Sequence, residues 1–504
     1  MFSGVFDHLM LGFTVALSMQ NLLYCFLGCF LGTVIGVLPG IGPVATIAML
    51  LPITFNLPPI PALIMLAGIY YGASYGGSTT AILVNLPGES SSVVTCIDGY
   101  QMGRQGRAGP ALAIAAMGSF FAGCVGTILI ALFGPPLAEL AFEFGAAEYF
   151  SMMVLGLVAA VVLASGSLIK AIGMIIVGLL GGIVGTDVNS GIARYSFGVS
   201  ELSDGIGFVS VAMGMFGFGE IISNLGQTAE TKSIEVSQVH TLMPTIDDIK
   251  TAIGPTVRGT LLGTIFGILP GSHTVIASFS SYTLEKKLAK DPSRFGKGAI
   301  EGVAGPESAN NAAAQTSFIP LLTLGIPTGA VMALMVGAMT IQGIAPGPQV
   351  MTQKPDLFWG MIASMWIGNL MLVILNLPLI GMWVQFLKIP YRILFPSILL
   401  FIAIGAYSIN NSEFDVYLAA FFGFFGYYAA KWGCEAAPMI LGFVLGPLME
   451  ENLRRAMLIS RGDPSVFFTR PISCGQLLVA FALLLMVVLP QFQKKREILA
   501  EADD

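Results

Sequence analysis

Two stretches of the chain repeat one pattern: residues 31–40 read LGTVIGVLPG, and residues 262–271 read LGTIFGILPG. Seven of the ten positions are identical and the other three are apolar in both copies. Each copy predicts an apolar helix whose glycines, Gly32/Gly36 and Gly263/Gly267, recur every four residues and let a neighbouring helix approach closely. Each helix then meets a Pro-Gly break, at residues 38–40 and 269–271, because proline cannot continue it.

The composition around these repeats is that of a membrane protein. Of the 504 residues, 55% are hydrophobic and only 10% are charged, whereas soluble domains carry about 25% charged residues. Apolar stretches near the roughly 20 residues needed to cross a bilayer recur along the whole chain. The sequence therefore predicts an all-α polytopic membrane protein with about 10–12 transmembrane helices.

A second pair of breaks supports a duplicated architecture. Residues 84–90 read VNLPGES and residues 324–330 read LGIPTGA, so a proline interrupts apolar sequence at residues 85–88 and again at residues 325–328. We predict a first half at residues 1–225, a connector at residues 226–250, and a second half at residues 251–504 that carries additional C-terminal helices.

Basic residues indicate that the two halves are inverted, because Lys and Arg accumulate in cytoplasmic loops. Residues 51–61, after the first repeat, contain no Lys or Arg, whereas residues 285–297, after the second, contain five. The bias reverses after the second breaks, where Arg104 and Arg107 follow the first copy. We therefore expect two inverted repeats with broken or re-entrant helices. Lys494, Lys495 and Arg496 favour a cytoplasmic C-terminus.

Broken helices inside a bilayer persist only where protein or a wet cavity surrounds them, so the breaks are the expected substrate site. Open amides at half-helix starts bind anions, and neutral polar side chains nearby suit a carboxylate. Packing is the alternative interpretation for the glycines and small hydroxyl residues. The predicted substrate-binding residues are Gly40, Gly42, Ser78, Thr79, Thr80, Asn85, Gly271, Ser272, Asn310, Asn311 and Thr316.

Intramembrane carboxylates are costly and often functional. We expect Glu89 and Glu307, together with Thr328, to hold a coupling ion, either Na⁺ or H⁺; an interfacial position is the alternative for the two carboxylates. His273 is interpreted either as a turn residue or as a substrate contact. No organic cofactor is expected, and no metal beyond a possible Na⁺.

Enzymatic function is disfavoured by what the sequence lacks. It has no Walker A loop and no HExxH motif, and its three histidines lie far apart. A GxSxG at residues 72–76 lies in a helical stretch, not in the strand-turn-helix that a nucleophile elbow requires. The six cysteines form no CxxC pair and are interpreted as packing residues.

At three motifs the chain resembles the large membrane subunit of the tripartite tricarboxylate transporters, the TctA family. The motifs are LPGIGP at residues 38–43, YGGSTTAILVNLPGE at residues 75–89 and FGKGAIEGVAGPESANNAA at residues 295–313. The resemblance implies a bacterial inner-membrane subunit that imports citrate-like tricarboxylates or related carboxylates by cation symport. It also implies two partners besides the lipid bilayer and the carboxylate: a small four-helix TctB-like membrane subunit and a periplasmic TctC-like substrate-binding protein. No nucleic-acid partner is expected. A channel or passive scaffold subunit is the alternative, and an intramembrane enzyme is less favoured.

Overall fold

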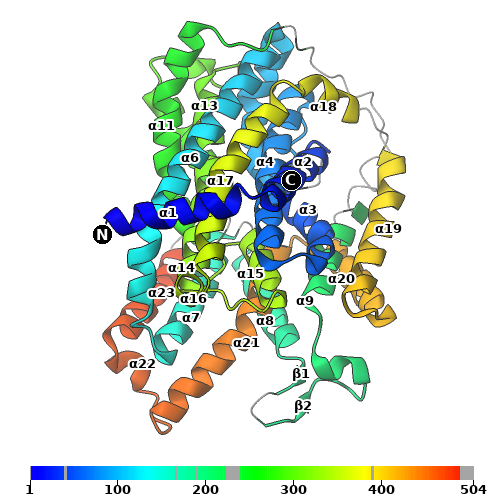
Figure 1. Cartoon of the computed structure of the whole chain (residues 1–504), viewed down its shortest axis with the longest axis vertical. Helices are drawn as coiled ribbons and strands as arrows, with labels where there is room; N and C mark the ends of the chain where they lie inside the picture. Colours follow the sequence, from blue (N-terminus) through cyan, green and yellow to red (C-terminus); the bar gives the residue numbers. More distant parts are fainter. Residues whose placement is uncertain are drawn as a thin grey trace.

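The computed structural model of the chain describes residues 2–38, 42–164, 167–187, 190–219, 221–222, 239, 241–269, 271, 273–387 and 391–488. These residues are helical almost throughout, as predicted (Figure 1). The first half contains α1 (Phe2–Ala16), α2 (Met19–Gly36), α3 (Pro43–Leu50), η1 (Leu51–Asn56), α4 (Pro59–Val84), η2 (Ser90–Ser92), α5 (Val93–Thr95), η3 (Cys96–Tyr100), η4 (Gly103–Arg107), α6 (Ala108–Ala141), α7 (Ala146–Leu163), α8 (Leu168–Gly182), η5 (Ser200–Asp204), α9 (Phe208–Ala212) and η6 (Met213–Phe218).

The second half begins with α11 (Ile246–Ile268), which starts inside the segment predicted as the connector. The rest of that segment lies largely outside the described residues. The helices that follow are α12 (His273–Leu288), η7 (Pro292–Arg294), α13 (Glu301–Thr316), α14 (Phe318–Leu324), α15 (Ala330–Ile341), α16 (Gln349–Gln353), α17 (Pro355–Asn376), α18 (Ile380–Phe386), α19 (Tyr391–Asn410), α20 (Glu413–Lys431), α21 (Ala436–Ile459), α22 (Val466–Thr469) and α23 (Pro471–Val488).

The helix that carries each copy of the glycine repeat packs tightly against the second α-helix after it. In the first copy, a Cβ placed on Gly32 would lie 2.4 Å from the carbonyl oxygen of Ile69 in α4. In the second copy, a Cβ on Gly263 would lie 2.1 Å from the carbonyl oxygen of Ala309 in α13. Only glycine allows backbones to approach this closely. The duplicated sequence thus forms two duplicated helix pairs, α2 with α4 and α11 with α13.

The two second breaks also share their local geometry. α4 ends at Val84 with Asn85 in the left-handed conformation (φ 59°), and α14 ends at Leu324 with Gly325 in the same conformation (φ 75°). A left-handed residue is a common way to end a helix, and asparagine and glycine are the residues that tolerate it best. The prolines Pro87 and Pro327 follow two residues later in both copies.

The centre of the molecule is formed by α4 and α13, whose residues are almost all buried. In Figure 1 these helices run beside α6, α11 and α17, and α1 crosses this group. The His8 ring of α1 stacks on Trp359 of α17 at a centroid distance of 5.3 Å. Both central helices carry buried Ser, Thr, Asn or Glu side chains, so the core is polar as well as apolar.

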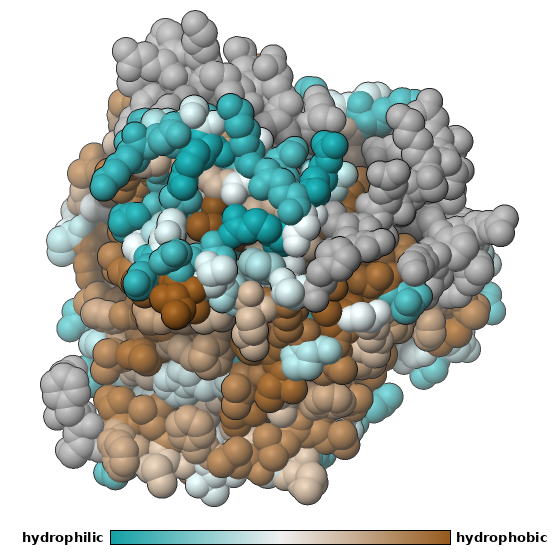
Figure 2. Space-filling view, turned by 90° about the horizontal axis from the view of Figure 1, so that it is seen from above, coloured by the Kyte–Doolittle hydropathy of each residue, from teal (hydrophilic) through white to brown (hydrophobic). Residues whose placement is uncertain are grey.

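By length and composition, three described helices are able to cross a membrane: Met19–Gly36, Gly103–Ala141 and Pro355–Asn376. Eight shorter apolar helices accompany them. Figure 2 shows a broad hydrophobic surface beside one region where hydrophilic side chains gather. A helical membrane protein is consistent with these features, whereas the count of 10–12 crossings and the inversion of the repeats stay predictions.

One small departure from the all-α expectation is a two-stranded antiparallel pair, β1 (Gly185–Thr186) and β2 (Ala193–Arg194). The side chain of Arg194 bonds Glu450 at 2.7 Å, so the pair is held against α21 by an ion pair. Strands this short have no periodicity that a sequence could display.

Candidate functional site

A buried carboxylate lies between the two halves. Glu307 of α13 is 1% exposed. Ser78 of α4 donates a hydrogen bond from Oγ to Glu307 Oε2 at 2.7 Å. Thr95 of α5 donates its hydroxyl to the other carboxylate oxygen, Oε1. Glu307 is thereby held by one hydroxyl from each of two first-half helices.

A second carboxylate faces the same helix. Glu89 follows the break at residues 85–88, and its Oε1 accepts a hydrogen bond from Nδ2 of Asn310 at 3.0 Å. Asn310 lies three residues after Glu307 on α13, a spacing that places both on one helix face. The close approach depends on glycine, because a Cβ on Gly88 would lie 2.3 Å from the Cα of Gly77 in α4.

Ser78, Glu89, Thr95, Glu307 and Asn310 are together called the acidic site. Within the described part of the chain, no ion pair joins Glu89 or Glu307 to a Lys, Arg or His side chain. Asn310 Oδ1 is buried and has no hydrogen-bond partner there. A buried carboxylate without a cationic side chain needs a proton or a bound cation to balance its charge.

The two breaks of the second half, at residues 269–271 and 325–328, contact each other. The backbone N–H of Gly271 donates to the carbonyl oxygen of Thr328 at 2.6 Å. Gly271 has a φ of 124°, a conformation that favours glycine. His273 Nδ1 lies 3.0 Å from the carbonyl oxygen of Gly271. Two buried polar atoms here, His273 Nε2 and Thr328 Oγ1, have no partner in the described residues.

Other predicted residues have structural hydrogen bonds. Thr80 donates to the carbonyl oxygen of Val37 at the end of α2, at 2.9 Å. Thr79 donates to Tyr75 within α4 at 3.3 Å. Thr316 donates within α13 to Ala312 at 2.8 Å and also lies 3.3 Å from the carbonyl oxygen of Thr264 in α11. These three threonines are buried in helix packing, so their role in binding remains a prediction.

Asn310 and Asn311 point to different neighbours. Asn311 Nδ2 donates to Ser119 Oγ of α6 at 2.7 Å and to the carbonyl oxygen of Glu307 at 3.0 Å. Adjacent residues on a helix point about 100° apart, so the pair does not face one site.

The remaining predicted residues lie at the first-half breaks or outside the described residues. Asn85 follows the last residue of α4 as its C-cap. Gly42 precedes α3 as its N-cap, and a Cβ added there would lie 3.8 Å from Cβ of Glu89, so this residue borders the acidic site. Gly40 and Ser272 lie outside the described residues.

Thr95 was not predicted from the sequence. Nor was Asp98, whose Oδ1 accepts a hydrogen bond from the backbone N–H of Gly298 at 2.8 Å and whose Oδ2 accepts one from the hydroxyl of Tyr282 at 2.9 Å. Thr95 and Asp98 lie in a short helical region, α5 and η3, that has no repeat partner in the sequence pattern. Asp98 was a lone carboxylate in apolar sequence, which was the one available signal.

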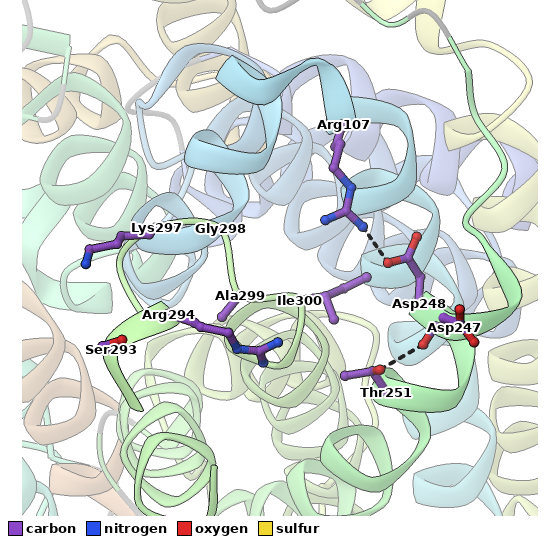
Figure 3. A pocket seen from close by; sticks show the side chains of 10 residues that line it. All are labelled: Arg107, Asp247, Asp248, Thr251, Ser293, Arg294, Lys297, Gly298, Ala299 and Ile300. Atoms are coloured by element: carbon purple, nitrogen blue, oxygen red, sulfur yellow. Dashed lines mark hydrogen bonds and ion pairs between the residues drawn. The ribbon is translucent and has the colours of Figure 1, made fainter. Parts of the chain in front are cut away.

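A polar pocket of about 330 Å³ lies between the halves, separate from the acidic site (Figure 3). It is called the basic pocket here. Its walls combine the end of η4, the start of α11, η7 and the loop that leads into α13. The lining residues are Arg107, Asp247, Asp248, Thr251, Ser293, Arg294, Lys297, Gly298, Ala299 and Ile300.

Most charges in the basic pocket are already paired. Arg107 bonds Asp248, and Arg294 bonds Glu301. Partial burial would raise the pKa of the Asp248 carboxyl, but hydrogen bonds from Thr245 and Arg107 outweigh it and hold that pKa below its usual value. The Arg107–Asp248 pair therefore ties the first half to the start of α11.

The helical fold, the apolar helices and a buried polar site between two duplicated helix pairs are consistent with a helical membrane protein. More narrowly, the chain belongs to the tripartite tricarboxylate transporter TctA family, whose model matches residues 22–441. This match confirms the resemblance that the three motifs indicate.

The chain is similar to two curated proteins of Agrobacterium vitis. It is 60% identical to an uncharacterized 52.8 kDa protein in the TAR-I ttuC' 3' region, over 97% of this chain and 98% of that protein. It is 62% identical to an uncharacterized protein in the TAR-II ttuC' 3' region, over 48% of this chain and all of that protein. No solved structure matches the chain.

Proposed function

We propose that this chain is the large transmembrane subunit of a binding-protein-dependent secondary transporter that imports tricarboxylates or related carboxylates by symport with Na⁺ or H⁺. Membership of the TctA family supports the transport function. The observation that carries the coupling mechanism is the acidic site, where Glu307 lies buried and Glu89 half-buried against neutral hydrogen-bond donors.

The coupling ion is assigned to this site on physical grounds. Two carboxylates in one buried site repel each other when both are ionised, so binding of one cation or proton stabilises the pair. Ser78, Thr95 and Asn310 provide neutral oxygen atoms that suit either Na⁺ or H⁺. Thr328, the third ligand predicted from the sequence, lies at the second-half break beside Gly271, and its buried Oγ1 is unpartnered in the described residues.

The carboxylate substrate is assigned to the breaks beside the acidic site. Open backbone amides and the N-terminal ends of half-helices favour anions. Two inverted repeats would place their breaks near the membrane midplane, where alternating access exposes a site to each side in turn. The predicted partners are a TctB-like four-helix subunit and a periplasmic TctC-like binding protein, in a bacterial inner membrane with the C-terminus in the cytoplasm.

Uptake of radiolabelled citrate by cells that contain all three subunits tests the proposal. Accumulation above the external concentration should survive ATP depletion while an imposed Na⁺ or H⁺ gradient remains. It should stop when an ionophore removes that gradient, because the gradient supplies the free energy. Gradient-independent equilibration without accumulation would instead support a channel, and accumulation without any ion gradient would contradict secondary transport.

A further inference from the structure

The two breaks of the second half bring together the starts of two helices. α12 begins at His273, and α15 begins at Ala330 with Gly329 as its N-cap. A Cβ on Gly329 would lie 3.0 Å from Cε1 of His273, so the two starts are in contact. Neither helix has an acidic residue in its first turn. Because a helix start carries partial positive charge, this contact, called the second-half junction, favours an anion.

The first half has an equivalent junction that contains a carboxylate. The aligned first breaks make Gly42 equivalent to His273. The aligned second breaks make Glu89 equivalent to Gly329. A Cβ on Gly42 would lie 3.8 Å from Cβ of Glu89, so the equivalent positions are in contact in both halves. The glycine and the polar side chain have exchanged places, and the second half has an imidazole where the first half has an acid.

Two buried polar atoms at the second-half junction have no partner in the described residues. Thr328 is 0% exposed and His273 is 6% exposed, yet Thr328 Oγ1 and His273 Nε2 form no hydrogen bond there. The backbone beside them is held in place, because the N–H of Gly271 donates to the carbonyl oxygen of Thr328 at 2.6 Å. Buried polar atoms without partners are costly, so a ligand that bonds both of them is favoured.

The hydrogen bond of His273 determines what its other nitrogen can bind. A carbonyl oxygen only accepts, so Nδ1, which lies 3.0 Å from the carbonyl oxygen of Gly271, carries a proton and donates it. None of the ion pairs in the described part of the chain includes His273. The two helix starts also disfavour a positive charge beside them, so the buried ring is neutral. In this tautomer Nε2 holds a lone pair and needs a donor from its ligand.

We propose that the second-half junction binds a 2-hydroxycarboxylate. The carboxylate lies at the two helix starts and accepts a hydrogen bond from Thr328 Oγ1, and the hydroxyl on the neighbouring carbon donates to His273 Nε2. This inference rests on the proposed transport function and names its substrate class. It places Thr328 with the substrate, because positive helix starts disfavour a coupling cation. Both side-chain atoms are shielded from solvent in this structure, and alternating access exposes the junction in other states of the cycle.

Pairs of acids that differ only in the hydroxyl measure this contact. Citrate and tricarballylate form one pair, and malate and succinate form the other. The dissociation constant of each acid is measured by titration calorimetry on the purified full-length chain in a buffer that contains Na⁺, without the binding protein, whose own preference would interfere. We expect the parent protein to bind the hydroxy acid about tenfold more tightly in at least one pair, because the acid without the hydroxyl leaves Nε2 unsatisfied.

Two substitutions of His273 separate its two nitrogens. His273→Asn keeps a donor near the position of Nδ1 for the Gly271 carbonyl and removes the acceptor at Nε2, so the preference should fall from about tenfold to less than about twofold. His273→Gln keeps an acceptor near the position of Nε2 and loses the donor, so it should retain most of the preference. A histidine that only stabilises the turn would give the opposite order, with His273→Asn resembling the parent protein.

Thr328 tests the carboxylate contact. Thr328→Val removes the hydroxyl at nearly constant shape and should weaken binding of both members of a pair equally, by about fivefold, because both carry the carboxylate. Thr328→Ser keeps the hydroxyl and should bind like the parent protein. His8→Asn is the control, since exposed His8 stacks on Trp359 in α17 and should change no affinity.

Equal affinities within both pairs in the parent protein would overturn the proposal, as would a preference that persists in His273→Asn or a parent that binds none of the four acids. Should His273→Asn not fold, the parent's preference and the comparison of Thr328→Val with Thr328→Ser decide. The binding assay needs no ion gradient. Equilibration without accumulation in the uptake experiment would therefore overturn symport and leave the hydroxyl preference to be read separately.

Discussion

At the scale of single residues, the hydrogen bonds of Glu307 suit a group that changes its charge. Ser78 Oγ lies 2.7 Å from Glu307 and 3.2 Å from the carbonyl oxygen of Ser74. When a proton or Na⁺ reaches the carboxylate, the hydroxyl is able to turn its hydrogen to Ser74 and present a lone pair instead. The Ser78 hydroxyl and the Glu307 carboxylate therefore keep hydrogen-bond or ion partners whether or not the cation is bound, and no helix has to move.

Glu307→Gln should abolish gradient-driven accumulation of substrate, because the amide neither takes up a proton nor carries a charge for Na⁺. Exchange of external labelled for internal unlabelled substrate should persist, since exchange needs no net movement of the coupling ion. Accumulation and exchange are measured in the same vesicles. Glu451→Gln, at an exposed ion pair on α21, is the control and should change neither. Normal accumulation by Glu307→Gln would remove Glu307 from the coupling site.

The neighbouring asparagines should behave differently. Asn310→Ala removes one hydrogen-bond donor from Glu89 and should weaken binding of the coupling ion or substrate by about 1–3 kcal/mol. Asn311→Ala breaks the bond to Ser119 between α13 and α6, so its main effect should be a lower melting temperature in detergent. Apparent affinity and melting are measured for both variants, with exposed Lys290→Ala as the control. An unchanged affinity in Asn310→Ala would place the site elsewhere.

At the scale of helices, the two glycine repeats make a prediction about stability. Gly32→Val and Gly263→Val each place side-chain atoms where a backbone carbonyl already lies, within 2.4 Å and 2.1 Å of the first added carbon. Overpacking costs about 1–3 kcal/mol where neighbours can adjust, and backbone atoms adjust least. Both variants should show lower melting temperatures and less folded protein. Gly173→Val in α8, where nothing lies within 4 Å, is the control. Equal melting of all three would contradict close packing.

The helices also show which parts of the site a sequence can predict. The repeats, the breaks, and Ser78, Glu89, Glu307 and Asn310 can be singled out from the sequence, because polar residues and prolines stand out in apolar sequence. Their roles in binding stay predictions. Thr80 was predicted to bind substrate, because a hydroxyl that bonds a helix end and one that binds substrate look alike in a sequence. In the structure it donates to the carbonyl oxygen of Val37. The hydrogen bond from the backbone N–H of Gly298 to Asp98 joins residues about two hundred positions apart, and no local sequence pattern predicts such a contact.

At the scale of the whole molecule, the structure brings two loops of different halves to one face. Gln105 Nε2 bonds the carbonyl oxygen of Lys297 at 2.8 Å, and Arg107 bonds Asp248 nearby. The basic loops after the first-half second break and after α12 are therefore neighbours. Since basic loops collect on the cytoplasmic side, this shared face is expected to be cytoplasmic.

Inversion of the halves is tested by labelling equivalent loops. Asn56 and Lys290 are both exposed and follow the equivalent helices α3 and α12, yet only the second loop is basic. The labelling uses the full-length protein in which the four partly exposed cysteines, at 96, 124, 434 and 474, are replaced by alanine. In this protein, Asn56→Cys should react with an impermeant maleimide in intact cells whose outer membrane is permeable. Lys290→Cys should react only in inside-out vesicles. Exposed Arg104→Cys is the control, because its neighbour Gln105 contacts Lys297 and it must label from the same side as Lys290→Cys. If Asn56→Cys also labels from that side, the two halves are parallel, and their breaks cannot form one alternating site by inverted symmetry.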